Sequence, residues 1–204
     1  GLEVAEGEYI YFIDSDDSIM PHTVGVLVNN VKEFQSDFCC YRYCFKNNTK
    51  ITKTCPNYGI ECYRTKDEII KDAFLGINIK TVIWAKFFRR DFLKKNKIGF
   101  LEGTINEDYL FTMQCAICSS RVSFCNDLLY CANERQGSVS RNIKAETISS
   151  LATIYNGVES MLKKYGIYHQ YKVFLYGGYT KLTLFSLFQV AYRLSSLKKF
   201  IRFY

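Results

Sequence analysis

The stretch Glu8-Tyr9-Ile10-Tyr11-Phe12-Ile13-Asp14-Ser15-Asp16-Asp17 decides the fold of this chain. Its first part is rich in aromatic and β-branched residues, which predicts a buried β-strand over residues 9–13. The strand ends in three carboxylates within four residues, and a helical pattern follows over residues 21–34. Like charges this close repel one another, and a packed core does not tolerate them unpaired. We therefore expect a positively charged group at the end of this strand.

Carboxylate oxygens are suitable ligands for hard cations such as Mg²⁺ or Mn²⁺. These ions commonly bind one or two carboxylates together with the phosphates of a substrate. The acidic turn therefore indicates metal or phosphate chemistry. The alternative is a solvated turn in which Asp17 or Ser18 caps the following helix. The residues alone leave both interpretations open.

Composition indicates an ordered globular protein with an anionic partner. The 204 residues are 48% hydrophobic and include only two prolines, enough for one domain or for one domain with a helical appendage. A net charge of +7 favours a nucleotide-sugar, a membrane surface or nucleic acid as partner. No Gly-rich phosphate loop or zinc-ligand array accompanies that charge, so we expect no nucleic-acid binding.

The cysteines and histidines do not indicate a disulfide framework, a zinc site or a catalytic triad. Nine cysteines are spread along the chain without the spacing of a disulfide framework. They predict buried, reduced thiols in a cytoplasmic protein. His22 and His169 are the only histidines, too few for a zinc site or a catalytic triad.

Local patterns predict the remaining elements. Thr65-Lys66-Asp67-Glu68 is a capping box and predicts a helix that runs to about Leu75. A hairpin is expected from residues 37–45 and 50–54, with a turn at Asn47-Asn48. Further extended pieces are predicted at residues 58–64, 81–85, 121–126 and 129–131, and further helices at residues 89–96, 107–118, 146–165, 168–190 and 191–203.

Three blocks of this sequence resemble family-2 glycosyltransferases with the GT-A fold. The first is residues 5–10 followed by Asp14-Ser15-Asp16-Asp17. The second contains the Trp84-Ala85-Lys86 segment and a basic helix, and leads through Ile98-Gly99-Phe100 into Asn106-Glu107-Asp108. The third runs from Tyr130 through Arg135 to Gly137-Ser138-Val139-Ser140. The three blocks stand in the family's order and cover residues 1–141.

The resemblance implies an α/β fold with a mixed sheet flanked by helices, followed by a C-terminal helical segment. Residues 1–141 are then a partial GT-A domain that carries the metal and acceptor half, and residues 142–204 are a helical extension. It also implies an enzyme of hexosyltransferase type. Such an enzyme moves a sugar from a nucleotide-diphospho-sugar to a hydroxyl of a glycan or lipid-linked acceptor, in bacterial cell-surface polysaccharide synthesis.

Site residues follow from the same resemblance. Asp16 is the expected main ligand of Mn²⁺ or Mg²⁺, and Asp14 contacts the ribose or assists the metal. Asp108 matches the position of the catalytic base of an inverting mechanism. Alternatively, Asp108 only reflects the ordinary preference for acidic residues in a first helical turn, where amide dipoles stabilise the ionised form. The candidate substrate-binding residues are Asp14, Trp84, Lys86, Glu107, Arg135 and Ser138.

Two of these assignments have alternatives. Trp84 either borders the acceptor pocket, where an indole can pack on a sugar ring, or belongs to the core. Lys86, Arg135 and the loop at residues 137–141 are expected to touch the diphosphate, while Ser138 alternatively only shapes the turn.

The resemblance also indicates what this sequence lacks. Family members begin with a strand and about a hundred residues that hold the nucleotide base and ribose, and here that part is missing. We therefore expect an N-terminally truncated fragment, and its alternative function is that of an inactive remnant. A second alternative is a haloacid-dehalogenase-type phosphatase, with Asp14 as nucleophile and Asp16 as acid/base.

The end of the sequence forms a basic amphipathic pattern. Residues 192–204 mix four Lys and Arg side chains with large apolar ones. Such a helix either lies on an anionic membrane surface or packs one face on the domain. Peripheral contact of this segment with the inner face of the cell membrane is therefore one of two open expectations. No stretch is apolar enough for a transmembrane helix.

Overall fold

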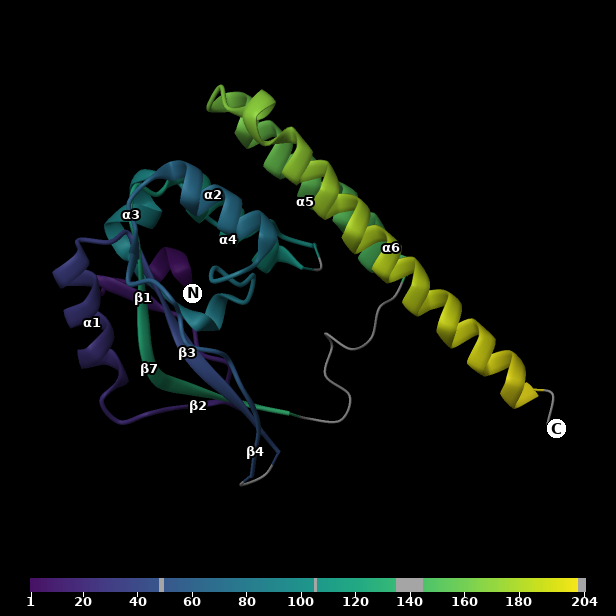
Figure 1. Cartoon of the computed structure of the whole chain (residues 1–204), viewed down its shortest axis with the longest axis horizontal. Helices are drawn as coiled ribbons and strands as arrows, with labels where there is room; N and C mark the ends of the chain where they lie inside the picture. The colour runs from purple at the N-terminus through teal and green to yellow at the C-terminus, as the bar shows by residue number, and fades with distance from the viewer. Residues whose placement is uncertain (48–49, 105, 135–144, 202–204) are drawn as a thin grey trace. The chain divides into compact units, whose positions relative to one another are not determined.

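The structure is a computed structural model that describes residues 1–47, 50–104, 106–134 and 145–201. Its contacts divide the chain into two compact units. The first unit is formed by Gly1–Leu101 and Asp108–Gln136, and the second by Glu102–Glu107 and Gly137–Tyr204. The first contains the sheet and the second a pair of long helices (Figure 1).

A mixed sheet is the centre of the first unit. Its described strands are β1 (Tyr9–Tyr11), β2 (Ser18–Ile19), β3 (Phe38–Asn47), β4 (Lys50–Thr54), β5 (Cys62–Tyr63), β6 (Lys86–Arg89) and β7 (Val122–Asn133). The strand order is β1-β6-β3-β7-β2, while β4 pairs with β3 and β5 with β7. The pairing of β3 with β7 is parallel and the other pairings are antiparallel.

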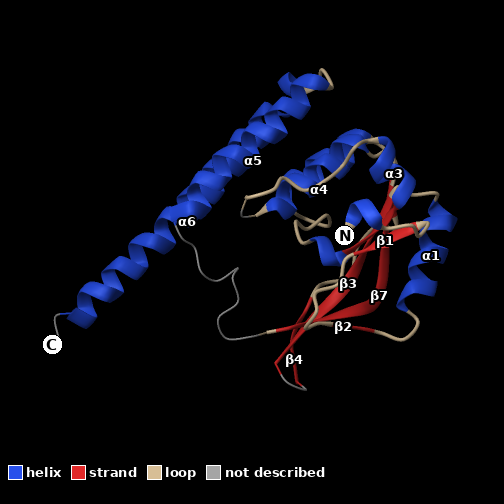
Figure 2. Cartoon of the chain, turned by 180° about the vertical axis from the view of Figure 1, so that it is seen from behind, coloured by secondary structure: helices blue, strands red, loops and turns tan. Residues whose placement is uncertain are grey.

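Short helices surround this sheet. They are α1 (Thr23–Phe34), α2 (Lys66–Leu75), α3 (Arg90–Lys95) and α4 (Glu107–Cys118), with 3-10 turns η1 (Leu2–Val4) and η2 (Ile83–Ala85). Helices α2, α3 and α4 gather at one end of the sheet, and the β3–β4 hairpin extends at the other (Figures 1 and 2). The core between these layers is strongly aromatic, and it includes Tyr41, Phe87 and Tyr130.

The second unit contains a helical hairpin. Helix α5 (Ala145–Lys164) packs against α6 (Tyr168–Ile201), and the turn between them passes through Gly166 at φ 70°. A left-handed φ of this kind favours glycine, so the sequence supports a sharp reversal here. Among the described residues, no helix combines the length and the apolar character that a bilayer crossing requires.

Most predicted elements are confirmed. The extended piece at residues 81–85 is wrong, and two pairs of predicted segments have the expected secondary structure but are each continuous in the structure. The capping box of Thr65 and Glu68 forms as expected, and α2 ends at Leu75. Residues 81–85 do not form a strand, because η2 occupies most of this stretch and the strand starts only at Lys86. Residues 121–126 and 129–131 are parts of one strand, β7, and the two predicted helices after residue 168 are one helix, α6. The side chains of residues 189–204, which include the predicted basic pattern, lie outside the described part.

All nine cysteines lie in described segments and none forms a disulfide, as the sequence predicts. Seven of them are buried. Burial raises the pKa of the Cys40 thiol to about 12, so it behaves as a small apolar side chain.

A buried carboxylate fixes the chain that leads from α2 toward η2. Asp72 is 4% exposed and accepts hydrogen bonds from the Tyr63 hydroxyl at 2.7 Å and from the main-chain nitrogen of Ile79 at 2.6 Å. The main-chain nitrogen and the side-chain amide of Asn78 complete its partners. The carboxylate therefore ties β5, α2 and the following loop together.

We expect Asp72→Ala to lower the free energy of unfolding by about 3 kcal/mol, because four donor groups lose a charged acceptor in the interior. Urea denaturation measures this loss. The matched control is Asp67→Ala on the same helix, whose carboxylate is 45% exposed and forms a surface salt bridge with Lys71. It should cost less than about 1 kcal/mol. Equal effects of the two substitutions would contradict the anchoring role of Asp72.

Candidate active site

The acidic stretch forms a tight turn between two strands. The main-chain nitrogen of Asp17 donates to the carbonyl oxygen of Asp14 at 3.0 Å, which closes a turn that begins three residues after the end of β1. Strand β2 then pairs antiparallel with β7, where Ser18 lies opposite Cys131. Asp14 and Ser15 are exposed and Asp16 is half-buried. The turn therefore presents two carboxylates, those of Asp14 and Asp16, at the surface of the first unit.

The third carboxylate, that of Asp17, is an internal anchor. One of its oxygens accepts a hydrogen bond from the Tyr130 hydroxyl at 2.6 Å, and the other accepts from the main-chain nitrogen of Asn133 at 2.7 Å. The side-chain amide of Asn133 also donates to the carbonyl oxygen of Asp16. The alternative that Asp17 or Ser18 caps the next helix is wrong, because α1 begins at Thr23 and is preceded by His22.

Tyr130 holds both ends of the turn. Its hydroxyl accepts from the main-chain nitrogen of Asp14 at 3.2 Å while it donates to Asp17. Burial and the neighbouring carboxylate of Asp17 raise the pKa of Tyr130, so its hydroxyl stays protonated and remains a donor. A hydrogen bond to a charged acceptor contributes about 1.5–3 kcal/mol. Tyr130 therefore fixes the conformation from which Asp14 and Asp16 project.

The electrostatics of the turn favour a bound cation. Partial burial raises the pKa of Asp14, and the negative charges of Asp17 and Asp16 raise it further. The charged form of Asp14 is thus less favoured than in an isolated carboxyl, and a cation beside these oxygens would reduce the repulsion. In the described part of the chain, no three His, Cys, Asp or Glu side chains converge on a possible metal position.

Trp84 lies against Tyr130, so the core alternative for this residue is realised. The two rings stack with centroids 4.8 Å apart and an interplanar angle of 14°. Tyr43 meets the indole edge-on at 4.7 Å, and the Tyr41 hydroxyl donates to the carbonyl oxygen of Trp84. The indole remains half-buried rather than fully enclosed. Its predicted contact with an acceptor sugar stays a prediction.

Asp108 occupies the second position of α4 and faces η2. The main-chain nitrogen of Ile83 approaches one of its carboxylate oxygens at 3.4 Å. One turn further along α4, the Thr112 hydroxyl donates to the carbonyl oxygen of Thr81 at 2.9 Å. These contacts fix the first turns of α4 to the segment before Trp84. Asp108 therefore has a defined position, in the helical turn where amide dipoles favour the ionised carboxylate.

Lys86 is buried beneath this segment. It is 1% exposed, and its ammonium group donates to the carbonyl oxygens of Lys80 and, at 2.7 Å, Val82. Burial lowers the pKa of Lys86, whereas the negative charge of Asp108 acts in the opposite direction. The predicted contact with a diphosphate would require this side chain to leave both carbonyl oxygens. In the structure its ammonium supports the loop that meets Asp108.

Aromatic contacts join the acidic turn to the helix that carries Asp108. Phe12, two residues before Asp14, packs edge-on against Phe111 at 5.7 Å, and Phe111 lies one turn after Asp108. The stack of Tyr130 on Trp84 makes a second connection, because Trp84 directly follows Ile83. The structure thus brings the first two sequence blocks together through two separate aromatic contacts.

The remaining predicted site residues have different outcomes. Glu107 is half-buried and opens α4. Arg135 and Ser138 lie outside the described residues. Sequence reasoning assigned no role to Asn133, Thr112 or Tyr130, although Tyr130 opens the third block. Their partners are 31 to 117 positions away along the chain, so no local signal reveals them.

Comparison with known proteins places this arrangement among glycosyltransferases. A cholesterol galactosyltransferase of Borreliella burgdorferi is 31% identical over 96% of this chain. An uncharacterized glycosyltransferase of Escherichia coli, YibD, is 26% identical over 69% of it. The chain spans 57% and 42% of these two relatives, respectively.

The fold has a counterpart among solved structures. A crystal structure of Staphylococcus aureus TarS 1–349 in complex with UDP-GlcNAc superposes with a TM-score of 0.60 at 23% identity, covering 82% of this chain and 50% of that one. This likeness confirms the expected GT-A type of α/β fold. Residues 1–103 match the family model described as Glycosyl transferase family 2. Since this span holds Asp14, Asp16, Trp84 and Lys86 and is half of the sequence, the chain belongs to glycosyl transferase family 2.

Proposed function

We propose that the protein containing this chain transfers a sugar from a nucleotide-diphospho-sugar to an acceptor hydroxyl, with a divalent metal and with inversion at the anomeric carbon. The observation that carries the proposal is the acidic turn, in which Tyr130 and Asn133 hold Asp17 while exposed Asp14 and half-buried Asp16 lie at the surface of the first unit. Family membership favours this chemistry over that of a dehalogenase-type phosphatase, which would use the same two residues.

Asp16 and Asp14 are the proposed ligands of Mn²⁺ or Mg²⁺. The Asp17 carboxylate already accepts hydrogen bonds from Tyr130 and Asn133, so donor phosphates would complete the ligand set of a bound metal. When bound, the metal neutralises the charge that develops on the leaving diphosphate. The protein's own part is to hold the two carboxylates in register, which Tyr130 and Asn133 do through Asp17.

Asp108 is the proposed catalytic base. As the acceptor hydroxyl attacks the anomeric carbon, the oxygen–carbon bond forms, the carbon–diphosphate bond breaks and the hydroxyl proton passes to Asp108. Lys86 and Thr112 are positioning residues, since they fix the loop and the helix on either side of this carboxylate. Glu107 opens the same helical turn and is proposed to contact the substrate.

The remaining contacts concern donor and acceptor. Trp84 is proposed to border the acceptor pocket with the part of its indole that Tyr130 leaves uncovered, and Arg135 and Ser138 to touch the diphosphate. The relatives support the two substrate classes: one is a cholesterol galactosyltransferase and others are poly(ribitol-phosphate) β-N-acetylglucosaminyltransferases. We propose a glycan or lipid-linked acceptor and a role in bacterial cell-surface polysaccharide synthesis.

For the base, we expect Asp108→Asn in the complete protein to leave donor binding within about twofold and to lower kcat by about 10²–10⁴, because only proton transfer is lost. Single-turnover transfer assays and nucleotide titration separate the two effects. The control is Asp67→Asn, the same change at the second position of α2, which should retain full transfer. Loss of donor binding in Asp108→Asn would contradict the assigned role.

For the metal, we expect isothermal titration of this chain with UDP to show binding only when Mn²⁺ or Mg²⁺ is present. Asp16→Ala should weaken that binding by at least about tenfold, because it removes one of two protein ligands. Glu33→Ala, at an exposed carboxylate of α1, is the control and should bind as the unsubstituted chain does. Binding of equal strength without metal would contradict the role of the acidic turn.

A further inference from the structure

The positive charge of this chain is concentrated in its last 45 residues. From Ser160 to Tyr204 the sequence contains eight Lys and Arg and no Asp or Glu. The 159 residues before them hold 19 basic and 20 acidic side chains, a net charge of −1. The net charge of +7 therefore belongs entirely to the helical end of the chain. An anionic partner is attracted to this end and not to the chain as a whole.

An exposed apolar stripe runs along α6 in the same region. Val173 is 74% exposed, Leu184 61% and Phe188 70%, and Tyr176 and Leu187 are about half exposed. At about 100° per residue these positions fall within one face about 120° wide. The opposite face, with Tyr171 and Leu175, is buried against α5. Helix α6 thus has one apolar face packed on α5 and one apolar face that α5 leaves exposed.

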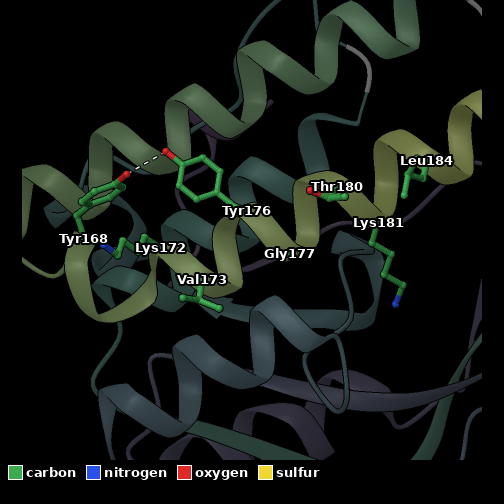
Figure 3. A pocket seen from close by; sticks show the side chains of 8 residues that line it. All are labelled: Tyr168, Lys172, Val173, Tyr176, Gly177, Thr180, Lys181 and Leu184. Atoms are coloured by element: carbon green, nitrogen blue, oxygen red, sulfur yellow. Dashed lines mark hydrogen bonds between the residues drawn. The ribbon is translucent and has the colours of Figure 1, made fainter.

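Lysines flank the open stripe on both sides. By the same helical geometry, Lys172 lies at one edge of the stripe and Lys181 at the other. These two residues, together with Val173, Tyr176 and Leu184, line a shallow hollow of about 840 Å³ (Figure 3). The Tyr176 hydroxyl is hydrogen-bonded to the Tyr168 hydroxyl at 2.9 Å. Large apolar side chains between lysines are the arrangement of a helix that lies in a membrane interface.

We propose that α6 docks through this stripe onto a lipid bilayer with anionic headgroups. The apolar side chains enter the boundary between headgroups and acyl chains, and Lys172 and Lys181 reach the lipid phosphates. No described helix is long and apolar enough to cross the bilayer, so the helix lies on the surface. A second copy of the chain is disfavoured as occupant, because two faces of the same strong positive charge repel each other.

The proposal goes beyond glycosyl transfer and does not depend on it. It uses only residues of the helical unit, and none of them belongs to the candidate active site. It also moves the expected membrane contact from residues 192–204 to the earlier face at Val173–Phe188, where side chains are described.

The test is flotation of the 204-residue chain with vesicles of phosphatidylcholine alone and of phosphatidylcholine mixed with phosphatidylglycerol. We expect binding to the mixed vesicles only, weakened by added salt. Leu184→Glu/Phe188→Glu should weaken it by about a hundredfold, and Lys172→Gln/Lys181→Gln by at least about tenfold. The variant Lys172→Gln/Lys181→Gln keeps the apolar face intact. It therefore tests the proposal even if Leu184→Glu/Phe188→Glu loses its helical circular dichroism.

The matched control is Val24→Glu/Leu75→Glu, which makes the same charge change at exposed apolar positions of α1 and α2. It should float with the mixed vesicles like the unsubstituted chain. Failure of the unsubstituted chain to float would overturn the proposal, as would equal binding to both lipid mixtures. Sedimentation showing a dimer that Leu184→Glu/Phe188→Glu dissociates, without vesicle binding, would assign the face to a second copy.

Discussion

The hydrogen bond from Tyr130 to Asp17 is the interaction on which the candidate site depends. Three carboxylates within four residues repel one another, and a turn that carries them needs a reason to stay closed. The Tyr130 hydroxyl and the main-chain nitrogen of Asn133 occupy both oxygens of Asp17, at 2.6 and 2.7 Å. One carboxylate is therefore used for structure. The other two, Asp14 and Asp16, are the ligands that we propose for a divalent cation.

The same tyrosine connects the acidic turn to the segment that contacts Asp108. Its ring stacks on Trp84, and such aromatic contacts contribute about 0.5–1.5 kcal/mol beyond the area they bury. Trp84 belongs to η2, whose first residue, Ile83, approaches Asp108 with its main-chain nitrogen. Beneath this turn the buried ammonium of Lys86 holds the carbonyl oxygen of Val82. The proposed in-line displacement would need the proposed metal ligands and base in a fixed relation, and these contacts connect the segments that carry them within the first unit.

Sequence reasoning predicted what local patterns and family resemblance encode. The acidic strand end, the capping box of Thr65 and Glu68 and the β3–β4 pairing all depend on residues a few positions apart. The anchoring role of Asp17 could not be predicted, since its partner Tyr130 is 113 positions away and only the β2–β7 pairing brings them together. Residues 81–85 were predicted as extended because their conformation, too, depends on contacts that the local sequence does not reveal. Contacts from Lys86, Thr112 and Tyr41, each to a carbonyl oxygen in or beside that segment, accompany a 3-10 turn instead.

A double-mutant cycle on Tyr130 and Asp17 tests most directly whether this one bond sustains the site. The quantity measured is the affinity of the chain for UDP in the presence of Mn²⁺, for Tyr130→Phe, Asp17→Asn and the double variant. If the bond holds the acidic turn, each single substitution weakens binding. The double variant is then no weaker than the weaker single one, because both remove the same interaction. Single variants that bind UDP and Mn²⁺ as tightly as the unsubstituted chain would contradict the account.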